Sequence, residues 1–175
     1  AAALQVRLGD AVHVEWATRY ANPAVGDVLT RMRDAGCDRI LIAPLYPQYS
    51  AATTASAHDA VAHWLEKQRW QPALRTLPPY ADDPAYIAAL HDDLSAQIAA
   101  LPFVPELLLL SFHGMPERTL HLGDPYHCHC RKTARLLAEE MAGTFPGLRV
   151  ETSFQSRFGK ATWLEPHTDA ELARE

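Results

Sequence analysis

The sequence has no long apolar run, no excess of basic residues and no even set of cysteines. No run of about 18 consecutive apolar residues occurs, so the sequence predicts no membrane-spanning helix. The net charge of −5 argues against nucleic acid or an anionic lipid surface as the main partner, because both are bound by clustered Lys and Arg. Three cysteines do not make the disulfide framework of a secreted domain, and a cytoplasmic location is expected.

The two ends of the chain have no usual start or stop signal. The sequence opens on AAALQVRLGD, without Met and without the basic start and apolar core of a signal peptide. It closes on DAELARE, a helical pattern with no stop signal after it. We therefore expect an internal segment of a longer protein.

Strand-like and helical patterns alternate along the chain. Hydrophobic residues make up 48% of the sequence, which is enough to form a buried core. Strands are predicted at residues 12–16, 39–43, 73–77, 106–112 and 148–154. Helices are predicted at residues 23–35 and 53–68 and after the Asp-Pro pairs at 83–84 and 124–125. The alternation predicts an α/β fold, with Rossmann-like parallel sheets and helices on both faces.

Three local signals support these helices. Asn22 precedes Pro23 and is expected to cap the first helix, which should stop at Gly36. The last helix should bury a stripe spaced by three or four residues, made up of Tyr126, Cys130, Thr133, Leu137 and Met141.

The loops that follow the predicted strands carry the candidate functional residues, because ligands of open parallel sheets bind at the carboxyl ends of the strands. His113 comes directly after the apolar run LLLLSF and before Gly114 and Pro116. A neutral imidazole there could accept a proton or a metal ion. A purely structural role for His113 in the loop is the alternative.

The HCHC cluster at residues 127–130 offers a second candidate site. Cys128 and Cys130 are two residues apart on the predicted helix, so they should point in nearly opposite directions. A zinc site needs about four convergent ligands, and no second cysteine pair is present. Cys130 is expected in the core, with His127, Cys128 and His129 on the helix surface. A structural metal site is the alternative.

Aromatic residues gather near the same predicted sheet edge as His113. They are Tyr46, Tyr49 and Trp163. Simple packing would explain them, but their position beside His113 would also suit a flat apolar ligand.

The sequence resembles the ferrochelatases, which insert ferrous iron into a porphyrin in haem synthesis. The stretches SFHGMPERTLHLGDPYHCHCRKTARLLA and SFQSRFGKATWLEPHTD are similar to two highly specific blocks of that family, and RYANP and LYPQYSAATTAS to two more. The blocks follow the family's order, the resemblance covers almost all of the chain, and the bacterial branch is the better match.

The resemblance implies two similar Rossmann-like lobes with a porphyrin cleft between them. Residues 1–102 would form the later part of the first lobe, and residues 103–175 the beginning of the second. The family's essential, metal-handling histidine corresponds to His113. Its partner glutamate would lie beyond Glu175, so the segment alone is expected to be inactive.

The resemblance also assigns roles to six further residues. Three would line a polar route to the metal side of the porphyrin, namely Arg19, Tyr20 and Tyr46. Three would contact the porphyrin itself, namely Pro116, Ser156 and Trp163.

Protoporphyrin IX and Fe²⁺ are the implied substrates, and no resident cofactor is predicted. Animal members hold an iron–sulfur cluster through a ligand in the loop matching YSAATT, where this chain has Ala51, so that cluster is not expected. The alternatives are a coproporphyrin III substrate, a porphyrin- or metal-binding fragment without turnover, and a structural domain with zinc at HCHC. Family members often touch a membrane at one face, although no stretch of this chain indicates it.

Overall fold

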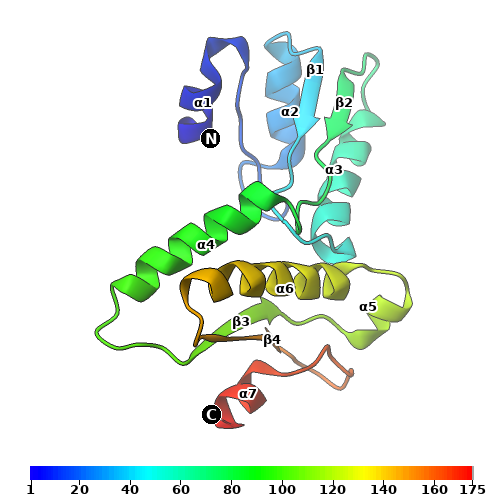
Figure 1. The fold of residues 1–175 in the computed structure, drawn as a ribbon. Coiled ribbons are helices and arrows are strands. Elements are labelled where there is room, and N and C mark those ends of the chain that lie inside the picture. The colour runs from blue at the N-terminus through cyan, green and yellow to red at the C-terminus, as the bar shows by residue number, and fades with distance from the viewer. Residues whose placement is uncertain (175) are drawn as a thin grey trace. The chain divides into compact units, whose positions relative to one another are not determined.

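The computed structural model describes residues 1–174, which form two compact units. The first unit combines Ala1–Tyr46 with Ala51–Pro78. The second combines Pro47–Ser50 with the chain from Pro79 onward. Each unit has its own pair of parallel strands and its own helices (Figure 1).

The first unit packs two helices against the parallel strand pair β1–β2. Its elements are α1 (Ala2–Leu8), the short turn η1 (Gly9–Ala11), α2 (Val25–Asp34), β1 (Arg39–Ile42), the π-helical turn η2 (Ala51–Ala55), α3 (Ser56–Leu65) and β2 (Ala73–Thr76). The strands pair in parallel, from Arg39 opposite Ala73 to Ile42 opposite Thr76. The core consists of Leu29 from α2, Ile40 from β1, and Val61 and Trp64 from α3.

The second unit places helices on both sides of the parallel strand pair β3–β4. Its elements are α4 (Pro84–Ala99), β3 (Leu107–His113), α5 (Glu117–His121), α6 (Tyr126–Thr144), β4 (Arg149–Gln155) and α7 (Thr168–Arg174). The helices α6 and α7 both contact β4, and they lie on opposite sides of the strand pair (Figure 1). The α/β fold with parallel strands, predicted from the alternation, is confirmed.

Several local predictions hold in detail. Asp83 caps α4, because its carboxylate accepts hydrogen bonds from the backbone N–H groups of Ala85 and Tyr86. Such a cap is worth about 1 kcal/mol. Gly36 follows α2 with φ of 88°, the left-handed conformation that ends helices. Of the predicted stripe on α6, Cys130, Thr133, Leu137 and Met141 are buried, whereas Tyr126 is only half-buried.

Two predictions were wrong. Val12–Trp16 is not a strand, because none of the described residues forms a ladder with it. The side-chain amide of Gln5 instead donates to the Val12 carbonyl and accepts from the Val14 N–H. Asn22 does not cap α2, which begins at Val25 after Ala24 and has no side-chain cap.

Strand β3 was expected to be buried and is only half-buried from Leu107 to Leu110. Among residues 1–174, only β4 pairs with it, so its other edge is uncovered. The helix α5, which was not predicted, has only five residues and is too short to show a helical period in the sequence.

The two compact units separate near Pro78, whereas the predicted boundary between the lobes is at residue 102. Helix α4 packs on α6 and therefore belongs to the second unit. The assignment of residues 1–102 and 103–175 to two lobes concerns the whole protein and stays a prediction. None of the helices within residues 1–174 combines the length and apolar character that crossing a bilayer requires.

Candidate functional site

His113 is the last residue of β3 and lies at the carboxyl end of the β3–β4 pair. It stands opposite Gln155, the last residue of β4, and its side chain is exposed. Because parallel strands end at the same edge of a sheet, the loops after β3 and β4 meet beside this histidine. The sequence predicted this location.

One hydrogen bond fixes which imidazole nitrogen of His113 carries the hydrogen. The Nδ1 atom lies 2.7 Å from the Gly114 carbonyl oxygen. A carbonyl oxygen can only accept, so Nδ1–H is the donor. In the neutral ring, the lone pair is then on Nε2, the nitrogen available to a proton or a metal ion.

Gly114 allows the two strand ends to approach closely. Its N–H donates to the Gln155 carbonyl at 2.6 Å. A Cβ atom at position 114 would lie 2.6 Å from that carbonyl oxygen and 3.2 Å from the Trp163 ring. Only glycine fits here without a shift of the backbone.

Pro116 and Trp163 form a two-bond antiparallel bridge beside His113. The Glu117 N–H donates to the Thr162 carbonyl, and the Leu164 N–H donates to the Met115 carbonyl, each at 2.9 Å. The bridge joins the loop after β3 to a segment almost fifty residues later. The structure thus brings the predicted residues Pro116 and Trp163 together with His113.

The Trp163 side chain is held on a second side. Its indole N–H donates to the Phe158 carbonyl at 3.0 Å, and the two rings lie 4.8 Å apart at 56°. Trp163 is buried, whereas Phe158 is 75% exposed. The Trp163 ring also lies against Gly114, the residue that follows His113.

Ser156 is the first residue after β4 and adopts an unusual backbone conformation. Its φ is 69°, a region that residues other than glycine rarely occupy. Such strain persists where the surrounding structure requires it, and it is frequent at ligand sites. The side chain is exposed at the same strand end as His113.

A small core supports this end of the sheet. Cys130, Phe154 and Leu164 form its buried centre, and Tyr126 packs against it. Burial raises the pKa of the Cys130 thiol to about 12, so this cysteine stays neutral and unreactive near neutral pH. Burial also raises the pKa of Tyr126, whose hydroxyl donates to the His113 carbonyl at 3.0 Å.

The predicted residues Arg19 and Tyr20 meet in the first unit, on Ser56 at the start of α3. The Arg19 guanidinium donates to the Ser56 carbonyl at 2.8 Å and to its hydroxyl at 3.0 Å. The Tyr20 hydroxyl lies 3.0 Å from the same Ser56 hydroxyl. The guanidinium also stands over the Tyr20 ring, 4.8 Å from its centre. Tyr46, after β1, is 44% exposed.

The two cysteines of the HCHC cluster divide as the helical spacing predicted, whereas the two histidines, expected on the surface, are partly buried. Cys130 is fully buried and Cys128 is exposed. His127 and His129 are half-buried, because the His127 ring packs on Phe154 and His129 Nδ1 accepts from the Tyr49 N–H. Across residues 1–174, no three His, Cys, Asp or Glu side chains converge as a metal site would require.

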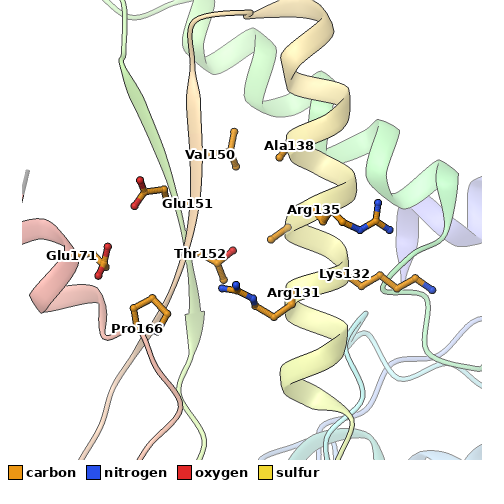
Figure 2. A pocket seen from close by; sticks show the side chains of 10 residues that line it. Arg131, Lys132, Arg135, Ala138, Val150, Glu151, Thr152, Pro166 and Glu171 are labelled. Atoms are coloured by element: carbon orange, nitrogen blue, oxygen red, sulfur yellow. The ribbon is translucent and has the colours of Figure 1, made fainter.

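A hollow of about 660 Å³ lies elsewhere in the second unit, between α6, β4 and α7 (Figure 2). Val150 and Thr152 lie on its α6 side, whereas Glu151 points toward α7 (Figure 2). Its lining does not include His113, so the hollow is separate from the loops around that histidine.

Three contacts of the site were not predicted from the sequence. Tyr126 was identified only as a core residue, Phe158 was not singled out, and Ser56 was not linked to Arg19. The GDPY motif that contains Tyr126 was a usable signal. The contact of Arg19 with Ser56 joins residues far apart in sequence, which spacing alone does not reveal.

The fold and site define a parallel α/β protein with an exposed histidine at the strand ends. A family model described as Ferrochelatase matches residues 1–175. The chain is 52% identical over 163 residues to a ferrochelatase of Rhizobium meliloti (strain 1021), which covers 93% of this chain and 48% of that protein. It is 50% identical over 169 residues to a ferrochelatase of Methylocella silvestris, with 95% and 48% covered.

The chain belongs to the ferrochelatase family. It spans about half the length of the curated relatives it matches. The resemblance found in the sequence motifs is thereby confirmed, whereas the roles of individual residues stay predictions.

Proposed function

We propose that the protein containing this chain is a ferrochelatase, a lyase that inserts Fe²⁺ into protoporphyrin IX to form protohaem. The observation that carries the proposal, beside family membership, is the exposed His113 imidazole with its lone pair on Nε2. Fe²⁺ is a substrate in this reaction and not a resident cofactor.

The reaction needs a group that takes protons from the porphyrin. A free-base porphyrin carries two inner N–H groups, and both protons leave as one Fe²⁺ enters. His113 Nε2 can accept such a proton, and the Gly114 carbonyl then still holds Nδ1–H of the imidazolium. The same nitrogen could instead pass the metal to the ring, and both roles need the Nε2 lone pair.

Pro116, Ser156 and Trp163 are assigned to the porphyrin wall. Support comes from the bridge that fixes Pro116 to Trp163 and from the strained backbone of Ser156. A rigid wall that fits a bent macrocycle better than a flat one favours the transition state over the free substrate.

Arg19, Tyr20 and Tyr46 are assigned to the route of the metal ion. Support comes from the polar cluster that Arg19 and Tyr20 form on Ser56, in which Tyr20 is 79% exposed. The route would belong to the first lobe, within residues 1–102. His113 would belong to the second lobe, within residues 103–175.

A partner carboxylate for His113 is assigned to the part of the protein outside these residues. Iron insertion is expected in the cytoplasm. Peripheral contact with the inner membrane is expected as well, because the porphyrin is a lipophilic substrate. Separation of membrane and soluble fractions in low and high salt would test that contact.

The test of the proposal is the variant His113→Ala in the full-length protein. Iron insertion is followed without oxygen, as the loss of porphyrin fluorescence. A general base contributes about 100-fold or more, so we expect kcat to fall by at least that factor with folding unchanged. The matched control is His121→Ala, an exposed histidine on α5, which should leave kcat unchanged.

Three results would contradict the proposal or redirect it. Near-normal turnover by His113→Ala would refute the role of this residue. Faster turnover of coproporphyrin III than of protoporphyrin IX would favour the alternative substrate. Tight porphyrin binding by the full-length protein without turnover would favour a binding function.

A further inference from the structure

The first residue of α6 contacts the backbone of His113. The Tyr126 hydroxyl donates a hydrogen bond to the His113 carbonyl oxygen at 3.0 Å. The bond joins α6 to the end of β3, across thirteen residues of sequence. Neither the sequence motifs nor the proposed function gives this hydroxyl a role.

The peptide group between His113 and Gly114 is held at both of its polar atoms. Tyr126 binds its carbonyl oxygen, and the Gln155 carbonyl accepts from its N–H at 2.6 Å. A planar peptide group held at both ends cannot rotate without breaking one of these bonds.

The orientation of this peptide group affects the position of the carbonyl that the imidazole binds. The next carbonyl, that of Gly114, accepts from His113 Nδ1–H at 2.7 Å. If the peptide group turned, the Gly114 carbonyl would move away from Nδ1. The imidazole would then lose the bond that keeps the hydrogen on Nδ1 and the lone pair on Nε2.

The Tyr126 ring is itself fixed in place. The Asp124 carboxylate accepts from the Tyr126 N–H at 3.0 Å, which sets the start of the 19-residue helix α6. The ring packs against the core around Cys130 and Phe154. Because the ring is fixed on α6, its hydroxyl fixes the position of the His113 carbonyl at the end of β3 relative to that helix.

We propose that Tyr126 is a positioning residue, whose hydroxyl holds the 113–114 peptide group so that the His113 imidazole keeps its Nε2 lone pair exposed. The proposal deepens the function proposed above and rests on it, since it concerns the proton- or metal-accepting nitrogen of that reaction. Tyr126 itself touches neither substrate.

The decisive variant is Tyr126→Phe in the full-length protein, which removes the hydroxyl and keeps the ring in the core. Two quantities are measured. One is the tautomer of His113, from two-bond ¹H–¹⁵N spectra of the histidine-labelled protein, with the His113 signals assigned by their loss in His113→Ala. The other is the pair kcat and KM for porphyrin.

We expect the His113 signal to change from the Nδ1–H tautomer to a mixture of tautomers. The loss of one neutral hydrogen bond should lower kcat about 10-fold. The KM for porphyrin should stay within about twofold, because no substrate contact is lost. The control is Tyr80→Phe, which removes a phenol hydroxyl from the same unit and should change neither quantity.

In a protein that inserts iron, only the change in tautomer together with the fall in kcat supports the proposal. An unchanged tautomer overturns it, and so does an unchanged kcat. A raised KM with kcat unchanged also overturns it, because the hydroxyl would then bind substrate. If the wild-type protein inserts no iron, the proposed function fails, and the tautomer alone decides whether Tyr126 positions His113.

Discussion

The two units contain the same element, a pair of parallel strands covered by helices, but the loops at the strand ends differ. After β3, the chain enters a bridged loop in which Gly114 and Trp163 are buried. After β1, the chain emerges with Leu45 82% exposed and Tyr46 44% exposed. The second unit therefore holds its candidate groups rigidly, whereas the first presents them on its surface.

This difference matches the chemistry proposed for each unit. A group proposed to accept a proton should keep one geometry, and His113 is held at its imidazole by the Gly114 carbonyl and at its own carbonyl oxygen by the Tyr126 hydroxyl. Groups that guide a hydrated ion need only a polar surface, and Arg19 and Tyr20 provide one through a single serine.

The largest effect is expected where the rigid loop is broken at a glycine. In Gly114→Ala, the new Cβ would meet the Gln155 carbonyl oxygen at 2.6 Å. Overpacking of this kind costs about 1–3 kcal/mol of unfolding free energy. Iron insertion should fall with it, because the Nδ1 partner of His113 moves.

The matched control for Gly114→Ala is Gly26→Ala in α2 of the first unit. There, the added methyl group would make only ordinary contact, 3.6 Å from Trp64. Alanine in place of a helical glycine should stabilise by about 0.5–1 kcal/mol. Thermal unfolding of the two variants should therefore shift in opposite directions, and a destabilised Gly26→Ala would contradict the comparison.

A smaller effect is expected at the surface cluster of the first unit. In Ser56→Ala, Tyr20 loses its hydroxyl partner and Arg19 keeps only the Ser56 carbonyl. Exposed polar contacts are worth about 0.5 kcal/mol, so we expect the KM for Fe²⁺ to rise about two- to threefold with stability nearly unchanged.

Steady-state kinetics at varied Fe²⁺ concentration measures the effect of Ser56→Ala. The control is Ser95→Ala on α4, which removes a hydroxyl outside both candidate sites and should leave the KM for Fe²⁺ unchanged. A fall in kcat as large as that of His113→Ala would mean that the surface cluster takes part in the chemical step.

The smallest effect is expected from modification of the exposed cysteine. Cys128 is exposed, whereas Cys130 is fully buried with its thiol pKa raised by burial to about 12. At pH 8, a maleimide should therefore label Cys128 and leave Cys130 unlabelled in the folded protein, with iron insertion retained. Mass spectrometry of the digested protein checks this, and rapid labelling of Cys130 would show that the core under His113 opens.

The sequence predicted the elements whose signals are local. The start of α4 was identified from the adjacent Asp83 and Pro84, and in the structure the Asp83 carboxylate accepts from N–H groups two and three residues away. The buried stripe on α6 was identified because it repeats along one helix. Asn22 shows the limit of such signals. It precedes a proline as a helix cap often does, yet α2 begins three residues later, at Val25, without a side-chain cap.

The candidate site was only partly accessible from sequence. His113 could be located because it ends an apolar strand pattern. The bridge between Pro116 and Trp163 and the bond from Tyr126 to His113 depend on how distant segments pack, and no local period encodes them. Val12–Trp16 is a clear local pattern that failed. Its residues alternate as in a strand, but no described residue pairs with them, so no strand forms.

The two hydrogen bonds of the Pro116–Trp163 bridge also bear on motion. Because they tie the chain after His113 to the chain around Trp163, we expect thermal displacements of the imidazole and the indole to be correlated. The spacing between the His113 imidazole and the Trp163 indole should then vary less than the position of either ring. If the proposed function is correct, a macrocycle held against Trp163 would meet the His113 imidazole at a nearly constant separation while the rest of the protein fluctuates.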